Sequence, residues 1–182
     1  LWVNMVTAVT LALALAFEPT EPDAMRRPPR DPQAAVFPGY FIWRTLLVTA
    51  IAVAGTLGVF QWEQHHGASL EVARTAAVNT LVMFEAFYLL NSRFLLAPPW
   101  PHRVLRGNPY VPGAIVLVVL LQLFYTYVPF MQALFRGGPL APEAWTRIVL
   151  VASSVYIIVE FEKWVARAGG WRLAEVSRTR RS

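Results

Sequence analysis

A single carboxylate in the middle of an uncharged stretch is the residue of this chain with the clearest capacity for chemistry. Glu85 is the only charged residue between Thr75 and Ser92. Tyr88 and Ser92 follow it at i+3 and i+7, so in a helix the three side chains share one polar face. A charge at the depth of a bilayer costs at least ~2.5 kcal/mol, which makes such a residue a functional candidate. Glu85 can coordinate a cation, or it can stay protonated and bond a neighbouring helix.

A second polar group opens the chain. Asn4 and Thr7 are spaced i and i+3, and Thr10 continues the same stripe. Amide and hydroxyl oxygens are suitable ligands for hard cations. The same groups also serve as hydrogen-bonding partners between membrane helices. From these residues alone, both interpretations stay open.

The other ionisable groups are weaker candidates. His65 and His66 follow Glu63, but they lack the ligand number and spacing of a metal site, so we interpret this segment as a solvated loop. Glu160 and Glu162 come just before a basic tail, and we interpret them as charges at the membrane interface rather than as ligands. The chain contains neither a phosphate-binding loop nor a phosphorylatable Asp in a soluble domain.

Long apolar segments must position these residues. Such segments carry at most one charge each, and they are Leu1–Phe17, Tyr40–Trp62, Thr75–Ser92, Tyr110–Phe135 and Ala144–Val159. About 20 mainly apolar residues span a bilayer as a helix, and the segments lack the alternation of barrel strands. We therefore predict an all-α membrane bundle of five transmembrane helices, the first one truncated. The predicted helices lie near Leu1–Phe17, Tyr40–Trp62, Ala73–Phe94, Tyr110–Phe135 and Ala144–Ala166.

Two prolines sharpen the prediction for the fourth segment. Pro112 is expected in the first turn of its helix, where a missing N–H is harmless. Pro129 is expected to kink or end the helix.

The composition supports a membrane protein. Hydrophobic residues make up 56% of the chain and charged residues 15%, which is too apolar for a soluble domain of 182 residues. A soluble helical bundle also requires a charged face on each helix, and Tyr110–Phe135 has none. Cysteine is absent, which excludes disulfides and thiolate chemistry within this chain.

The basic residues indicate an orientation. Thirteen of the sixteen lie in the first connection, the third connection or the tail, and only Arg74, Arg136 and Arg147 belong to the opposite side. The positive-inside rule then places the C-terminus in the cytoplasm. We expect residues 1–168 to form a membrane domain and residues 169–182 a basic cytoplasmic tail. The expected partner of this multi-pass chain is the lipid bilayer of a plasma membrane or bacterial inner membrane, and not nucleic acid.

Several motifs resemble one known family. Residues 1–7 read Leu-Trp-Val-Asn-Met-Val-Thr, residues 16–19 read Ala-Phe-Glu-Pro, and residues 23–30 read Asp-Ala-Met-Arg-Arg-Pro-Pro-Arg. These motifs resemble the sixth transmembrane helix of calcium-pump-like, cation-transporting P-type ATPases and the connection after it. Phe84-Glu85 and Asn91-Ser92 are similar to the eighth helix. The resemblance covers nearly the whole chain as helices six to ten.

The resemblance implies the ion-translocating membrane module of an ATP-driven cation pump. It implies Asn4, Thr7 and Glu85 as cation ligands. ATP and Mg would bind in the parent pump, whose N-terminal remainder would supply helices one to five and the cytoplasmic domains. The resemblance implies no cofactor in this chain, which alone should not hydrolyse ATP.

Three positions depart from the family pattern. Ala8, Val9 and Leu11 stand where the calcium-pump branch has Asp, Gly and Pro. Loss of the Asp charge argues against two-site calcium transport, and leaves one divalent site, a monovalent ion or a proton on Glu85 as alternatives. Without Gly and Pro, we predict a continuous helix over Asn4–Leu15 with no unwound ligand loop.

A free-standing membrane protein, such as a secondary transporter subunit or an accessory protein, is the alternative. Leu1–Phe17 lacks the basic flank and the cleavage site of a signal peptide, so we expect the chain to be the C-terminal part of a longer protein. An Asp-Lys-Thr-Gly-Thr phosphorylation motif encoded upstream would support the pump. A start codon within a few residues would support the alternative.

Overall fold

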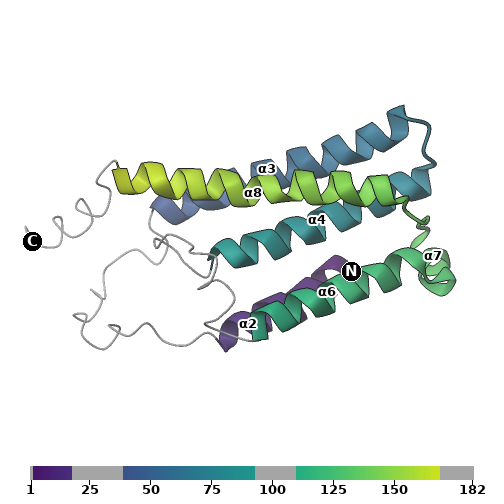
Figure 1. The fold of residues 1–182 in the computed structure, drawn as a ribbon, viewed down its shortest axis with the longest axis horizontal. Helices are drawn as coiled ribbons and strands as arrows, with labels where there is room; N and C mark the ends of the chain where they lie inside the picture. The colour runs from purple at the N-terminus through teal and green to yellow at the C-terminus, as the bar shows by residue number, and fades with distance from the viewer. Residues whose placement is uncertain (1, 18–38, 93–109, 169–182) are drawn as a thin grey trace, which may run out of the picture.

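The structure is a computed structural model that describes residues 2–17, 39–92 and 110–168. Within these ranges the chain forms helices joined by short connections and no strand, which confirms the all-α prediction (Figure 1). The helices are α1 (Trp2–Thr7), the π-helix η1 (Ala8–Ala12), α2 (Leu13–Ala16), α3 (Gly39–His65), α4 (Leu70–Ser92), α6 (Tyr110–Tyr127), α7 (Pro129–Phe135) and α8 (Pro142–Ala168). The predicted basic tail, residues 169–182, lies outside the described residues.

Two of these helices are long and apolar enough to cross a membrane by length and composition. They cover Phe41–His65 in α3 and Tyr110–Tyr127 in α6. Many large apolar side chains on the outer faces of the helices are exposed, among them Leu57, Leu120 and Ile157. Exposed apolar surface on this scale is unusual for a soluble monomer and typical of a surface that contacts lipid or other helices.

The opening segment is continuously helical, as predicted, but it contains one irregular turn. Its path is helical from Trp2 to Ala16 with no unwound loop, but Ala8–Ala12 forms a π-helix instead of regular α-helix. Two hydroxyls donate hydrogen bonds to backbone carbonyls of the preceding turn. Thr7 Oγ1 donates to the carbonyl of Val3, and Thr10 Oγ1 donates to the carbonyl of Val6. Such i−4 bonds compete with the backbone ladder and bend helices. The prediction of a continuous helix without an unwound loop is confirmed, and the π-helical turn is a local departure from α geometry within it.

Prolines divide the fourth apolar segment as predicted. Pro112 lies in the first turn of α6, and α6 ends at Tyr127. Pro129 then occupies the first turn of α7, where its missing N–H costs nothing. The break is held in place by Tyr127, whose hydroxyl donates to the carbonyl of Leu140 and accepts from Trp145 Nε1.

A tight turn joins α3 to α4. Gly67 adopts a positive φ of 81°, a conformation that glycine reaches at little cost. Ser69 Oγ then accepts a hydrogen bond from the backbone N–H of Val72 and caps the start of α4. This turn makes α3 and α4 antiparallel neighbours.

Helix α4 contributes residues to both of the two apolar cores. The first core packs α4 against α3 and α8, and it includes Val59, Phe84 and Ile148. The second packs α4 against the opening helices and α6, and it includes Val82 and Val118. Figure 1 shows the same arrangement, with α3, α4 and α8 grouped together and α2 and α6 on the other side of α4. A residue on α4 can therefore contact either half of the bundle.

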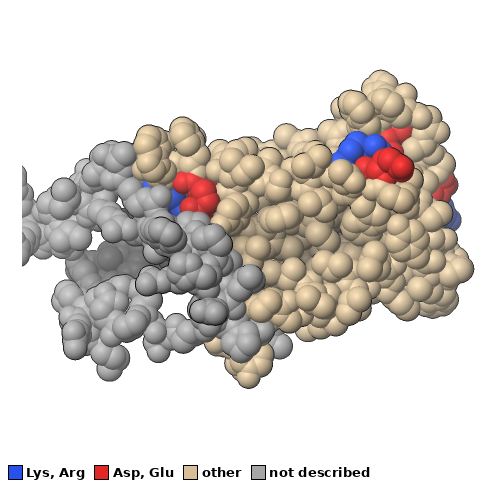
Figure 2. All heavy atoms as spheres, in the orientation of Figure 1, with Lys and Arg blue, Asp and Glu red and all other residues tan. Residues whose placement is uncertain are grey.

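Ion pairs join α3 to α8 at both ends. At one end Arg44 Nη2 lies 2.7 Å from Glu162 Oε2, and at the other Arg147 Nη2 lies 2.6 Å from Glu63 Oε1. Figure 2 shows, on the face that it presents, charged side chains near the two ends of the bundle with uncharged surface between them. On this face the middle of the bundle carries no exposed charge, which suits a hydrocarbon environment.

Candidate functional site

Glu85 lies in the middle of α4, at the contact between α4 and the opening helix. Its side chain is half-buried, and its Oε2 atom is buried without a hydrogen-bond partner among the described residues. The Thr7 side chain of α1 lies beside the Glu85 carboxyl. The structure therefore brings together two of the three side chains that the sequence nominated as ligands.

The Thr7 hydroxyl lies beside two acceptors, the backbone carbonyl of Val3 and the carboxyl of Glu85. The Thr7 side chain is buried, and its hydroxyl donates to the carbonyl of Val3 at 2.9 Å. A hydroxyl has one proton and two lone pairs, so Thr7 can donate to either acceptor and still offer a lone pair to the other side. The Glu85 carboxyl and the Thr7 hydroxyl can therefore share a proton or coordinate a cation between them.

The backbone beside this pair is irregular. The π-helix η1 begins at Ala8, directly after Thr7. Single-turn π segments inside helices are frequent at functional sites, because they widen the helix and change the direction of nearby groups. The π-helical turn lies at the position where the calcium-pump branch has the Asp and Gly of its ligand loop. This chain has Ala8 and Val9 there instead.

Asn4, the third nominated ligand, differs from the pair in its exposure. Its side chain is exposed on α1, and no hydrogen bond in the described part of the chain joins it to Thr7 or Glu85. Tyr88, one turn after Glu85, lies near the Arg44–Glu162 pair instead of forming part of the Thr7 contact. Ser92 turns back to the carbonyl of Leu89 at the end of α4.

Three other acidic residues and one histidine have structural partners. Glu63 pairs with Arg147, and Glu162 with Arg44. Glu160 pairs at 2.8 Å with Lys163, whose side chain is fully buried and also donates to the carbonyl of Asn91. His66 stacks on Trp62, with ring centroids 4.2 Å apart. Within residues 2–17, 39–92 and 110–168, no group of three or more acidic or histidine side chains could hold a metal ion.

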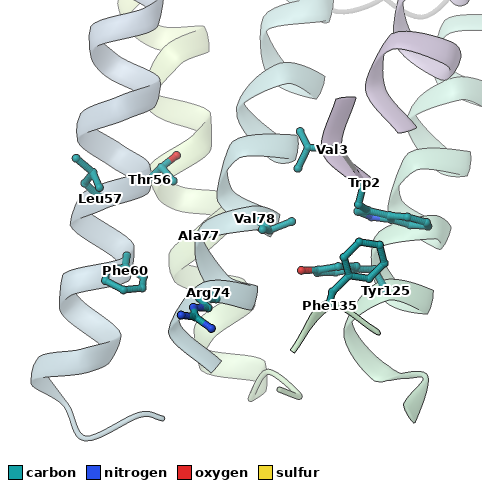
Figure 3. Close-up of a pocket in the computed structure, with 10 residues that line it drawn as sticks. All are labelled: Trp2, Val3, Thr56, Leu57, Phe60, Arg74, Ala77, Val78, Tyr125 and Phe135. Carbon is teal, nitrogen blue, oxygen red and sulfur yellow. The ribbon is translucent and has the colours of Figure 1, made fainter. Parts of the chain in front are cut away.

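A cavity of about 480 Å³ opens between the two halves of the bundle, near the start of α1. Figure 3 shows Trp2, Tyr125 and Phe135 together on one side of it and Phe60 on the other. Arg74 also lines this cavity. A mainly apolar, aromatic wall with a guanidinium group is a poor environment for a cation, so the Thr7–Glu85 contact is the better candidate for cation binding.

Sequence reasoning missed one set of buried polar residues. Asn79, Gln122 and Thr126 have no exposed side-chain surface, and they lie where α4 faces α6. The available signal was the presence of two amides, Asn79 and Gln122, within long apolar helices, where a polar group must find a partner. The sequence analysis considered charged residues within the apolar segments and did not consider neutral amides.

Comparisons with known proteins identify the family of this chain. Residues 1–165 match the family model described as cation transporting ATPase, C-terminus. The probable cation-transporting ATPase F of Mycobacterium tuberculosis is 40% identical over 167 residues, which cover 92% of this chain and 18% of the relative. An endoplasmic reticulum-type calcium-transporting ATPase 3 of Arabidopsis thaliana is 28% identical over 205 residues, covering 94% of this chain and 20% of the relative. This chain thus spans about a fifth of the length of the curated relatives it matches, and it belongs to the family of cation-transporting ATPase C-terminal regions.

Proposed function

We propose that this chain is the membrane-embedded, ion-translocating C-terminal module of an ATP-driven cation pump. The observation that carries the proposal is the half-buried carboxyl of Glu85, which meets the hydroxyl oxygen of Thr7 in the middle of a membrane-type bundle of this family. The module supplies part of the path of the ion. ATP and Mg bind elsewhere in the parent pump, in the N-terminal remainder that also supplies the other membrane helices.

The proposed topology has five membrane-spanning helices and a cytoplasmic C-terminus. Two long apolar helices support it, together with the uncharged surface between the bundle ends in Figure 2 and the bias of basic residues toward one side. The fourth span is divided into α6 and α7 at Pro129. The module lies in a plasma membrane or a bacterial inner membrane.

Glu85 and Thr7 form the core of the proposed cation site, with Asn4 as a third ligand. The exposed side of α1 that carries Asn4 is available to the parts of the pump that precede this chain. One carboxylate with neutral oxygens suits a single cation or a proton better than two calcium ions, because each calcium ion prefers several charged ligands. The relatives' names support cation transport and leave the identity of the ion to experiment.

The substitution Glu85→Gln in the full-length pump tests this proposal. It keeps the shape of the side chain and removes its charge. We expect the cation concentration for half-maximal ATP hydrolysis to rise roughly tenfold or more, which corresponds to the loss of a charge-assisted contact worth at least about 1.4 kcal/mol. ATP hydrolysis is measured in proteoliposomes against a panel of monovalent and divalent cations and across pH.

Glu143→Gln is the matched control, because Glu143 is exposed in the first turn of α8. Its cation dependence should equal that of the unmodified pump. Glu160 and Glu162 are poor controls, since removal of either charge leaves a buried Lys163 or Arg44 without its carboxylate partner. An unchanged cation and pH dependence in Glu85→Gln would assign Glu85 a purely structural hydrogen bond and refute the proposed site.

A further inference from the structure

Two buried amides on facing helices each carry an atom without a partner in the part of the chain that the structure describes. These atoms are Oδ1 of Asn79 on α4 and Nε2 of Gln122 on α6. Neither side chain has any exposed surface. A buried polar atom without a partner costs about 1–3 kcal/mol, so each such atom calls for an explanation.

The orientation of the Gln122 amide is fixed by Trp2. The indole Nε1–H of Trp2 lies 2.8 Å from Gln122 Oε1. An indole N–H can only donate, so the atom that it meets must be the amide oxygen. The free atom of Gln122 is therefore the NH₂ group, a donor.

The orientation of the Asn79 amide is fixed in the same way. Asn79 Nδ2 lies 2.9 Å from the backbone carbonyl of Thr75 and 3.0 Å from Thr126 Oγ1. A carbonyl can only accept, so the atom that it meets must be the amide nitrogen. The free atom of Asn79 is therefore the oxygen, an acceptor.

The spacing along α6 puts these two amides within about one helical turn of each other. Thr126, the partner of Asn79, follows Gln122 by four residues on α6. Side chains at this spacing are neighbours on a helix, with Cβ atoms about 5–6 Å apart. The Gln122 amide consequently lies one turn along α6 from the point where Asn79 touches that helix.

We propose that a single water molecule binds between Asn79 and Gln122. It donates to Asn79 Oδ1 and accepts from Gln122 Nε2, and two hydrogen bonds of about 2.7–3.2 Å span a gap of roughly 5–6 Å. A cation is disfavoured by the N–H groups of Gln122, and an anion by the carbonyl oxygen of Asn79. A molecule that both donates and accepts satisfies both atoms.

The bound water completes a hydrogen-bonded chain across three helices. The chain runs from Trp2 on α1 to Gln122 on α6, through the water to Asn79 on α4, and on to Thr126. Trp2 precedes Thr7 by five residues, and Asn79 precedes Glu85 by six. The water therefore ties α1 to α4 on one side of the Thr7–Glu85 contact, whether or not that contact binds an ion.

The direct test is an experimental structure of the full-length protein at a resolution that shows ordered water. We expect one density peak at about 2.7–3.2 Å from both Asn79 Oδ1 and Gln122 Nε2. A direct bond between the two amides, a third protein group on either atom, or a dry contact would each overturn the proposal. This readout involves neither ATP nor transport, so its failure differs from a failure of the proposed function.

A double-mutant cycle of Asn79→Leu and Gln122→Met gives a second test by thermal unfolding in detergent. The bonds to Trp2 and Thr126 each involve one member of the pair and cancel in the cycle. We expect the decrease in melting temperature of the double variant to be smaller than the sum of the decreases of the two single variants. The reason is that each single change already leaves the water without one partner. Asn91 is the matched control, since it is also a buried amide of α4 with a free Oδ1, twelve residues from Asn79. Asn79→Leu should be additive with Asn91→Leu, and additivity in both pairs would refute the bridge.

Discussion

At Gly55 the helices α3 and α4 touch with no room for a side chain. A Cβ atom at this position would lie 2.5 Å from Cζ and 2.7 Å from Cε2 of Phe84, and 3.0 Å from Cγ1 of Val151. The Phe84 ring is itself buried in the first apolar core, so it has little freedom to move away. The absence of a side chain at one residue thus allows α3 to approach the helix that carries Glu85.

Gly55→Ala should destabilise the protein for this reason. We expect a loss of about 1–3 kcal/mol, the usual cost of overpacking, and a lower melting temperature in detergent. Gly58→Ala is the matched control on the same helix, because a Cβ there meets nothing within 4 Å. The control gains the helix propensity of alanine without a clash, so it should melt at the same temperature or slightly higher. Equal melting of the two variants would contradict the close contact.

The sequence was sufficient to identify the single charged residue of the candidate site. It was not sufficient to predict which side chains of other helices contact that residue. Glu85 was identified because a charge inside an apolar membrane segment is costly. The same cost makes it turn toward a polar neighbour such as Thr7 and away from lipid. Asn4 followed the same spacing rule, but the structure leaves its side chain exposed. Spacing alone identifies the residues that share a helix face, and it does not reveal which neighbour that face meets. The link between Asn79 and Gln122 depends on packing between helices and escaped the prediction for that reason.

At the scale of elements, the Arg44–Glu162 pair fastens the start of α3 to the end of α8. The exposed fraction is 3% for the Arg44 side chain and 13% for that of Glu162. Removal of one charge from a buried pair is more harmful than replacement of both, because the remaining charge stays desolvated. The pair therefore specifies how α3 and α8 align.

Arg44→Met should lower the free energy of unfolding by about 3–5 kcal/mol, measured by thermal unfolding of the purified protein. The double variant Arg44→Met with Glu162→Leu should recover part of this loss, since no unpaired carboxylate remains. Arg74→Met, at an exposed arginine of α4, serves as the control for the chemical change and should have a small effect. A double variant less stable than Arg44→Met alone would contradict a pair that acts through mutual neutralisation.

Helix positions were predicted well where the length of an apolar segment determines them. They were predicted less well where side-chain hydrogen bonds to the backbone determine the local helix geometry. The break at Pro129 follows from the geometry of proline, and the structure has it between α6 and α7. The π-helix at Ala8–Ala12 had no such signal, since every residue there tolerates regular helix. It accompanies hydroxyl bonds of Thr7 and Thr10 whose formation depends on rotamers. Helix α3 continues to His65, beyond the predicted Trp62.

At the scale of the whole molecule, the proposed topology predicts opposite chemical accessibility for the α3–α4 turn and the tail. This chain has no cysteine, so a single introduced thiol in it is easily assigned. In intact cells, Gln64→Cys in the last turn of α3, next to the α3–α4 turn, should react with a membrane-impermeant maleimide, because this exposed residue lies on the proposed outer side. Ser177→Cys in the tail should react only after the cells are opened. The opposite pattern would invert the orientation, and equal labelling of both sites in sealed cells would refute it.

The two ion pairs between α3 and α8 have a consequence for the lipid around the protein. Arg44 and Glu63 are nineteen positions apart on α3, which at about 1.5 Å per residue is roughly 28 Å. This distance is close to the ~30 Å of an average hydrocarbon core, so each pair falls near one boundary between acyl chains and headgroups. Thicker or thinner bilayers would draw one pair into hydrocarbon or force the helices to tilt, each at a cost in free energy. Turnover of the full-length pump should therefore peak in vesicles of intermediate acyl-chain length, and replacement of both pairs by apolar residues should broaden that peak.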